Sequence, residues 1–291
     1  MSPIGVTWAG VAINTVLGAG KISAGVMFHS QSILADGIHS LSDLITDFAV
    51  LLGLRVSRRP ADEDHPFGHL RVSTLTALFV GAMLVIAAAW IAYEAVTTLR
   101  ARNDDVDAMV PLAVALVSIA SKETLYQITR IIGRRSGDPA IMANAWHHRT
   151  DAFSSIAVAV GLSAVMIGGP QWAFLDHVVA LVLATFLVWV GVQTIRSASS
   201  ELVDRAPDEK TLAGIREAIS RTDGVRDFHA MRARQVGGKV SMDVHVMVNP
   251  DLTVKQGHDI ASRVEASVRN NSERVIGVTV HIEPERRGPD Y

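Results

Sequence analysis

The sequence predicts an α-helical membrane protein with six transmembrane helices, followed by a C-terminal cytoplasmic α+β domain of ferredoxin-like α-β-β-α-β order. Three observations support this fold class. Hydrophobic residues make up 49% of the 291 positions and the mean hydropathy is +0.27, which is high for a soluble protein. Charged residues are scarce before about position 200 and dense after Glu201. After Arg205 the hydrophobic periodicity changes to that of short helices and strands.

Six apolar windows are each long enough to cross a bilayer, which takes about 20 mostly apolar residues per helix. The first window has no basic segment before it and no small-residue cleavage site after it, so we expect a retained span and not a removed signal peptide. The windows cover residues 4–28, 31–55, 72–99, 108–131, 143–168 and 174–196.

The arginines flanking these windows predict the orientation of the chain. Most of them fall on one side, whereas Arg100 and Arg102 stand beside three aspartates on the other. Cytoplasmic loops are enriched in basic residues, so both termini are expected in the cytoplasm. The arginines on the predicted cytoplasmic side are Arg55, Arg58, Arg59, Arg71, Arg130, Arg134, Arg135 and Arg196.

The segment after Arg205 alternates between the two regular periodicities. Val240 to Val248 places valine and methionine at every second position, which predicts a strand with one hydrophobic face. We therefore expect a transmembrane transport domain over residues 1–205 and a cytoplasmic metal-binding and dimerisation domain over 206–291. A domain of about 85 residues has a modest core, which favours dimerisation. The predicted elements are a helix to about 221, strands over 228–236 and 240–248, a helix over 254–270, and a strand through 278–282.

Two spans contain matching pairs of ionisable residues. His39 and Asp43 lie four apart in ADGIHSLSDLITD, and His147 and Asp151 lie four apart in AWHHRTD. This spacing puts each pair on one helix face, so two imidazoles and two carboxylates can close a tetrahedron that suits Zn²⁺. His148 is three residues from Asp151 and satisfies the same geometry. The alternative is that these groups face lipid headgroups or satisfy one another as buried pairs.

Other features of the sequence narrow the chemistry. Asp36, Asp47, Lys122 and Glu123 also interrupt the spans, and either shape a water-filled route or cap helices near an interface. The chain has no cysteine, so metal ligands must be imidazole, carboxylate or backbone oxygen. A net charge of −2 and the absence of a phosphate-binding loop or catalytic triad argue against nucleic acid, nucleotide or enzymatic turnover.

These motifs resemble the cation diffusion facilitator family over essentially the whole chain. By this resemblance, His39, Asp43, His147 and Asp151 are transport ligands of the zinc-moving type, whereas manganese-moving members carry more carboxylate. The loop PADEDHPFGH resembles the family pattern PADxxHxxGH and implies a second metal site at Asp62, His65 and His69, although loop residues of this kind can equally be plain solvated groups. The continuation departs from the family pattern, because Leu70, Arg71 and Ser73 replace GKxE.

The C-terminal domain carries a third group of candidate ligands. His245, His281 and Glu283 are on the strand faces turned away from the hydrophobic positions. The resemblance adds His229 and His258, and implies a regulatory metal cluster across a dimer. The alternative is an ordinary solvated sheet face.

The sequence thus predicts a transporter that exports Zn²⁺ from the cytoplasm in exchange for protons, because imidazole must lose its proton to bind metal. The expected partners are the lipid bilayer, protons and a second copy of the chain, in the inner membrane of a bacterial cell. Three alternatives stay open: export of Fe²⁺, Mn²⁺, Co²⁺ or Cd²⁺ by the same fold, a non-transporting metal-sensing membrane scaffold, and a passive channel.

Overall fold

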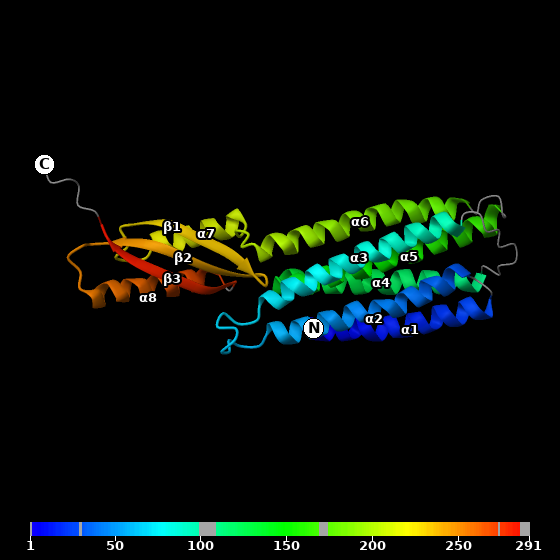
Figure 1. The fold of residues 1–291 in the computed structure, drawn as a ribbon, viewed down its shortest axis with the longest axis horizontal. Helices are drawn as coiled ribbons and strands as arrows, with labels where there is room; N and C mark the ends of the chain where they lie inside the picture. The colour runs from blue at the N-terminus through cyan, green and yellow to red at the C-terminus, as the bar shows by residue number, and fades with distance from the viewer. Residues whose placement is uncertain (1, 29–30, 99–108, 169–173, 273, 286–291) are drawn as a thin grey trace. The chain divides into compact units, whose positions relative to one another are not determined.

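The computed structural model describes residues 2–28, 31–98, 109–168, 174–272 and 274–285 (Figure 1). The chain divides into two compact units, Met1–Ser199 and Ser200–Tyr291.

The N-terminal unit contains the six long helices that the sequence predicts. They span 25 to 30 residues, or about 37 to 45 Å at a rise of 1.5 Å per residue, which exceeds the roughly 30 Å hydrocarbon core of a bilayer. By length and composition alone, three described stretches qualify as membrane spans: Pro3–Met27, Arg71–Trp90 and Met109–Ser136. The helices are α1 (Pro3–Met27), α2 (Gln31–Ser57), α3 (Arg71–Thr98), α4 (Met109–Ser136), α5 (Pro139–Gly168) and α6 (Phe174–Leu202).

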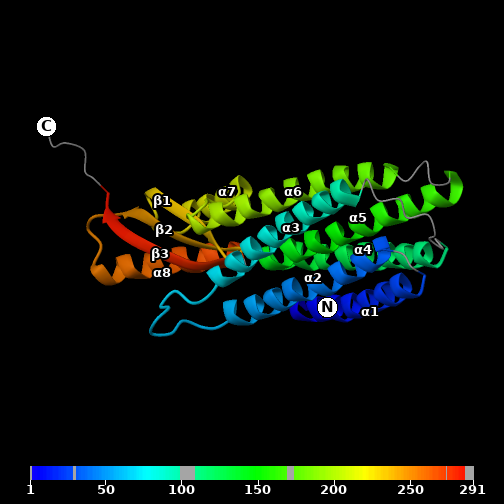
Figure 2. The same cartoon turned by 45° about the vertical axis from the view of Figure 1, so that its right-hand side comes forward.

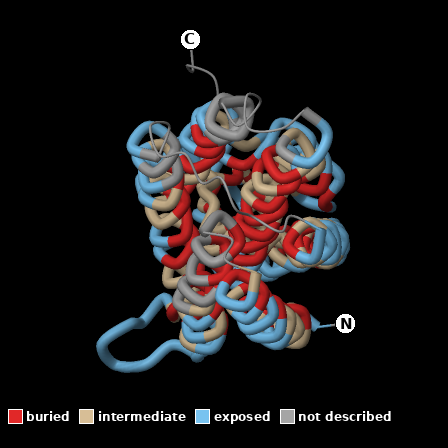
Figure 3. Tube along the Cα trace, turned by 90° about the vertical axis from the view of Figure 1, so that its right-hand side faces the viewer, coloured by how far each residue is buried: buried red, intermediate tan, exposed pale blue. Residues whose placement is uncertain are grey.

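The six helices run side by side, as both ribbon views show (Figures 1 and 2). Helix α1 packs along α2 and α4 along α5, and the pairs meet through contacts of α1 with α4 and of α2 with α5. The end-on view shows buried positions facing inward and exposed positions facing outward (Figure 3). Large apolar side chains such as Trp8, Leu52 and Trp90 are more than half exposed. An outward apolar surface around a polar interior is the pattern of a bundle solvated by lipid.

The C-terminal unit is a three-stranded sheet with two helices on one face. Strand β2 is central, antiparallel to β1 and parallel to β3, and α8 makes the crossover between the parallel strands. Alternate β2 residues from Val240 to Val248 are buried against Ile215 and Ile219 of α7 and Ile260 of α8. The predicted α-β-β-α-β order is confirmed. The elements are α7 (Glu209–Ser220), β1 (Asp227–Val236), β2 (Lys239–Val248), α8 (Val254–Asn271) and β3 (Val275–Pro284).

Candidate metal centre

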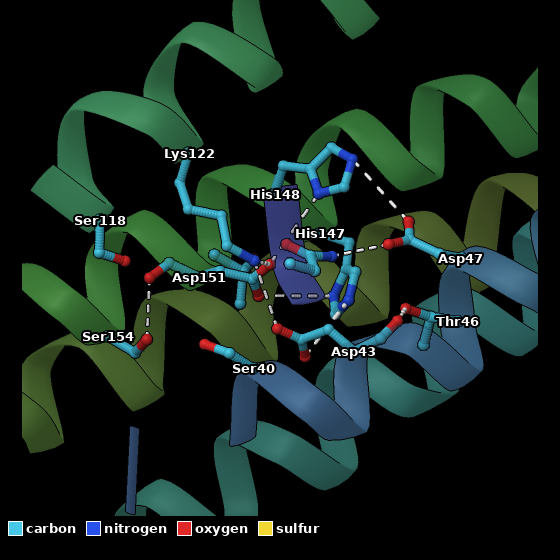
Figure 4. A network of polar contacts seen from close by, with 12 residues as sticks. Ser40, Asp43, Thr46, Asp47, Ser118, Lys122, His147, His148, Asp151 and Ser154 are labelled. Atoms are coloured by element: carbon cyan, nitrogen blue, oxygen red, sulfur yellow. Dashed lines mark hydrogen bonds and ion pairs between the residues drawn. The ribbon is translucent and has the colours of Figure 1, made fainter. Parts of the chain in front are cut away.

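Three ionisable side chains meet at the centre of the helical bundle. Asp43 comes from α2, and His147 and Asp151 come from successive turns of α5 (Figure 4). One ligand atom from each lies within 4.8 Å of the others, and each residue is at most 3% exposed. The four-residue spacing puts His147 and Asp151 on one face of α5, and the packing of α2 against α5 brings Asp43 to that face.

The imidazole of His147 lies between the two carboxylates. Its Nε2 is 3.5 Å from Asp43 Oδ1, and its Nδ1 is 3.7 Å from Asp151 Oδ1. Neither ring nitrogen has a hydrogen-bond partner among the described residues. Buried polar atoms are normally paired, so this arrangement suits a cation that takes one nitrogen and two oxygen ligands.

Lys122 of α4 supplies a positive charge beside this centre. Its Nζ donates to Asp151 Oδ2 at 2.6 Å and lies 3.4 Å from Asp43 Oδ2, and the side chain is fully buried. The ammonium therefore balances carboxylate charge inside the bundle. A divalent cation bound to the same carboxylates must compete with it.

The other residues predicted for this centre take different positions. His39 belongs to α2, one turn before Asp43, but its side chain is outside the described part of the structure. His148 points away from the Asp43 carboxylate: its Nε2 is 4.0 Å from Asp47 Oδ1, and its Nδ1 is 4.0 Å from Asp151 Oδ2. The three-residue cluster therefore contains His147 and not His148.

A further polar cluster, absent from the sequence prediction, joins α1 to α2 and α5. Lys21 Nζ lies 2.7 Å from Asp36 Oδ2 and donates to Ser40 Oγ and Ser155 Oγ. Ser154 and Ser155 also donate to the Asp36 carboxylate. The sequence could have predicted this cluster from Lys21. It is a lone charge in an apolar window, and a charge in that position normally has a partner.

The loop between α2 and α3 brings Asp62, His65 and His69 together. Asp62 Oδ1 is 3.3 Å from His65 Nδ1, and Asp62 Oδ2 is 3.4 Å from His69 Nε2. The backbone N–H of His65 donates to Asp62 Oδ1 and lowers the pKa of that carboxyl. Gly68, at φ 78°, permits the turn that returns His69 to the cluster. This group is partly exposed, so water can complete the coordination of a bound cation.

The open face of the C-terminal sheet carries four of the predicted ligands. His229, His245 and His281 stand side by side on neighbouring strands, in register. Glu283 contacts all three imidazoles, with oxygen to nitrogen distances of 3.3, 2.8 and 3.5 Å respectively. His229, His245 and Glu283 form a group with metal-ligand spacing.

The chain itself does not bring His258 to this group. His258 lies on the exposed side of α8, and α8 covers the face of the sheet opposite to the histidines. A role for His258 alongside them requires a residue from outside the single chain.

The fold and the buried centre define a class of protein: an integral membrane protein with a buried cluster of candidate metal ligands inside a helical bundle, followed by a sheet domain. Known proteins match the same architecture. The Cation efflux transmembrane domain matches residues 7–203, and the Cation efflux protein cytoplasmic domain matches residues 207–285.

Relatives match over nearly the whole chain. The manganese efflux system protein MneP of Bacillus subtilis is 31% identical over 93% of this chain and 92% of its own length. Metal tolerance protein 2 of Oryza sativa is 33% identical over 94% of this chain and 76% of its own, and the magnetosome protein MamB of a Magnetospira strain is 28% identical over 97% and 95%. The chain belongs to the cation diffusion facilitator family of divalent metal efflux transporters.

Proposed function

We propose that the chain exports Zn²⁺ from the cytoplasm of a bacterial cell across its inner membrane, in exchange for protons and as a homodimer. The observation that carries the proposal is the buried group of Asp43, His147 and Asp151, whose ligand atoms lie within 4.8 Å of one another. Mixed nitrogen and oxygen ligands suit Zn²⁺, and His39 precedes Asp43 by one helical turn. The cytoplasmic domain supports the dimer, because it matches the family's cytoplasmic domain.

Proton exchange follows from competition at the same atoms. An imidazole nitrogen that carries a proton cannot bind a metal, so Zn²⁺ and H⁺ exclude each other at His147. A site that faces a more acidic exterior therefore releases its metal and returns carrying a proton. Rocking of helix groups around a fixed site is the usual way in which such transporters alternate access.

Mn²⁺ is the second candidate cargo, because of the composition of the described site. Two of its three ligands are carboxylates, which suit harder cations, and the relative from Bacillus subtilis is named as a manganese efflux protein. Affinity order alone does not select a metal in cells.

Flux into proteoliposomes tests the proposal. Zn²⁺ and Mn²⁺ uptake are measured with and without an imposed pH gradient, for wild type and for Asp43→Asn. We expect gradient-dependent Zn²⁺ uptake in wild type and at least a hundredfold loss in the variant. If wild type takes up Mn²⁺ faster than Zn²⁺, the cargo is manganese. If the pH gradient has no effect on uptake, the chain does not exchange metal for protons. The control is Asp64→Asn, an exposed loop carboxylate that contributes to none of the clusters above.

A further inference from the structure

A second set of unpaired polar atoms lies next to the central group. Asn14 of α1, Asp47 of α2 and His148 of α5 are all fully buried. Asn14 Nδ2 donates to Asp47 Oδ2 at 2.6 Å, which leaves Asp47 Oδ1 and Asn14 Oδ1 without a hydrogen-bond partner among the residues described. Both ring nitrogens of His148 are also without one. Of these unpaired atoms, His148 Nε2 and Asp47 Oδ1 face each other, and Asn14 carries a further unused oxygen on the residue that binds Asp47.

The distances suit a small cation. Asp47 Oδ1 and His148 Nε2 are 4.0 Å apart, and a dashed line joins the two side chains in Figure 4. An ion midway between them lies about 2 Å from each, which is a metal–ligand distance for both carboxylate oxygen and imidazole nitrogen.

The packing of α1 keeps this place open. Gly10 is one helical turn before Asn14, and a Cβ at Gly10 would lie 3.2 Å from His148 Cε1 and Nε2 and 3.6 Å from Asp47 Oδ1. An alanine here would press on the His148 ring and would be in van der Waals contact with Asp47. A glycine at this position therefore leaves room around the atoms that have no protein partner.

The set lies one turn from the central group. Asp47 follows Asp43 by four residues, about 6 Å along α2, in the direction of the loop that carries Asp62. Helix α1 begins at the same end of the bundle at which α2 ends (Figure 1). With the predicted orientation, this end faces the cytoplasm.

We propose that Asn14, Asp47 and His148 form a second binding site for a divalent transition-metal cation, on the cytoplasmic side of the Asp43–His147–Asp151 centre. Asp47 and His148 supply one oxygen and one nitrogen ligand, and Asn14 both orients Asp47 and offers its amide oxygen. A cation leaving water on its way to the central group is held here first, one turn away. The inference rests on the proposed cation transport, but its test is binding and does not depend on flux.

The number of Zn²⁺ ions bound per chain tests the site. The purified full chain is equilibrated with Zn²⁺ alone, and bound metal is counted by dialysis for wild type, Asp47→Asn, Asp43→Asn and the double variant. We expect each single variant to lose one ion per chain or to weaken it at least tenfold, and the double variant to lose two. His148→Gln should lose the same Zn²⁺ ion as Asp47→Asn. If Asp47→Asn does not fold, the Zn²⁺ count of His148→Gln is the test of the site. Gly10→Ala, which keeps every ligand, is expected to weaken the same ion.

Several results separate this site from its alternatives. Thr7→Val, a buried change on α1 outside the set, is the control and should bind as wild type does. Unchanged Zn²⁺ binding in both Asp47→Asn and His148→Gln overturns the second site. Loss of the same single ion in Asp43→Asn and Asp47→Asn also overturns it, because the two groups then make one site. A chain that binds both ions yet moves no Zn²⁺ contradicts the proposed function and leaves this site standing.

Discussion

Lys122 supplies the positive charge beside the two carboxylates of the central group. Its ammonium lies beside both carboxylates, at 2.6 Å from Asp151 and 3.4 Å from Asp43, inside a fully buried environment. Lys122→Met should destabilise the metal-free protein by about 3 to 5 kcal/mol, because buried carboxylates lose their positive partner. The same change removes a competitor for metal, so Zn²⁺ should bind the variant more tightly. Thermal unfolding of the purified protein, with chelator and with Zn²⁺, measures both effects.

Lys210→Met is the matched control, since Lys210 is exposed on α7. It should behave as wild type in both conditions. Equal stability of Lys122→Met and wild type in chelator would show that the ammonium does not balance the buried carboxylates.

The sequence predicts imidazoles and carboxylates at the centre of the bundle. It does not show which of two adjacent ionisable residues turns into the bundle and which turns to its surface. The spacing of His147 and Asp151 follows from helix geometry alone. Lys122 and Glu123 form an adjacent opposite pair in the sequence, yet successive helix residues point about 100° apart. Lys122 turns into the bundle, whereas Glu123 lies 3.7 Å from Arg149 on its partly exposed surface. Only the packing of α4 on α5 decides this.

Helices α3 and α6 approach each other through a pair of glycines. A Cβ at Gly191 would lie 2.7 Å from Val85 Cγ2 and 3.0 Å from the carbonyl oxygen of Gly81. Gly191→Ala should therefore push the helices apart and destabilise the bundle by about 1 to 3 kcal/mol, as overpacking does. Loss of thermal stability in detergent or lipid nanodiscs is the measurement.

Gly20→Ala provides the comparison for that change. A Cβ at Gly20 meets nothing within 4 Å, so this substitution gains helix propensity without a clash and should be neutral or stabilising. If both alanine variants behave alike, close approach of α3 and α6 contributes nothing to stability.

Helix α7 depends on the ionised carboxylate of Asp208. Asp208 accepts hydrogen bonds from the Thr211 backbone N–H and hydroxyl, both at 2.9 Å, and the backbone bond is the main cause that lowers its pKa below the usual 3.8. A lowered pKa means that the stabilisation is fully present above pH 3.8 and is lost as the pH falls through the folded-state value. Asp208→Ala should cost about 1 kcal/mol at pH 7.

The pH dependence distinguishes this cap from a general effect of the substitution. The difference in unfolding free energy between wild type and Asp208→Ala, from urea titrations, should be constant between pH 5 and 7 and shrink in more acidic solution. A difference that stays the same down to pH 2.5 would contradict an ionised cap.

The elements themselves follow closely from local patterns in the sequence. The windows 31–55 and 143–168 become α2 over Gln31–Ser57 and α5 over Pro139–Gly168, because helices continue past the apolar stretch into polar turns at the membrane surface. The alternation in β2 correctly separates the valine face from the face of His245. The bulge between His229 and Arg232 in β1 is a feature of strand pairing, which periodicity along one strand does not contain.

At the scale of the whole molecule, we expect metal bound to the histidine face of the C-terminal sheet to control dimerisation. Glu283 joins His229, His245 and His281 on an open face, and His258 is on the other side of the domain, so one chain leaves the predicted five-ligand group incomplete. Where two chains meet through this face, metal held on it can take ligands from the same face of both chains, because isologous contacts bring identical surfaces together. Zn²⁺ should therefore raise the dimer fraction of the full chain at low protein concentration, measured by light scattering after size exclusion, and chelator should reverse the increase.

Two variants test whether the histidine face causes this response. Glu283→Gln should abolish most of the response to Zn²⁺, whereas Glu285→Gln, which changes an exposed carboxylate two residues on, should keep it. A dimer fraction that ignores Zn²⁺ in wild type would assign dimerisation to contacts other than the metal and leave the histidine face as a binding site only.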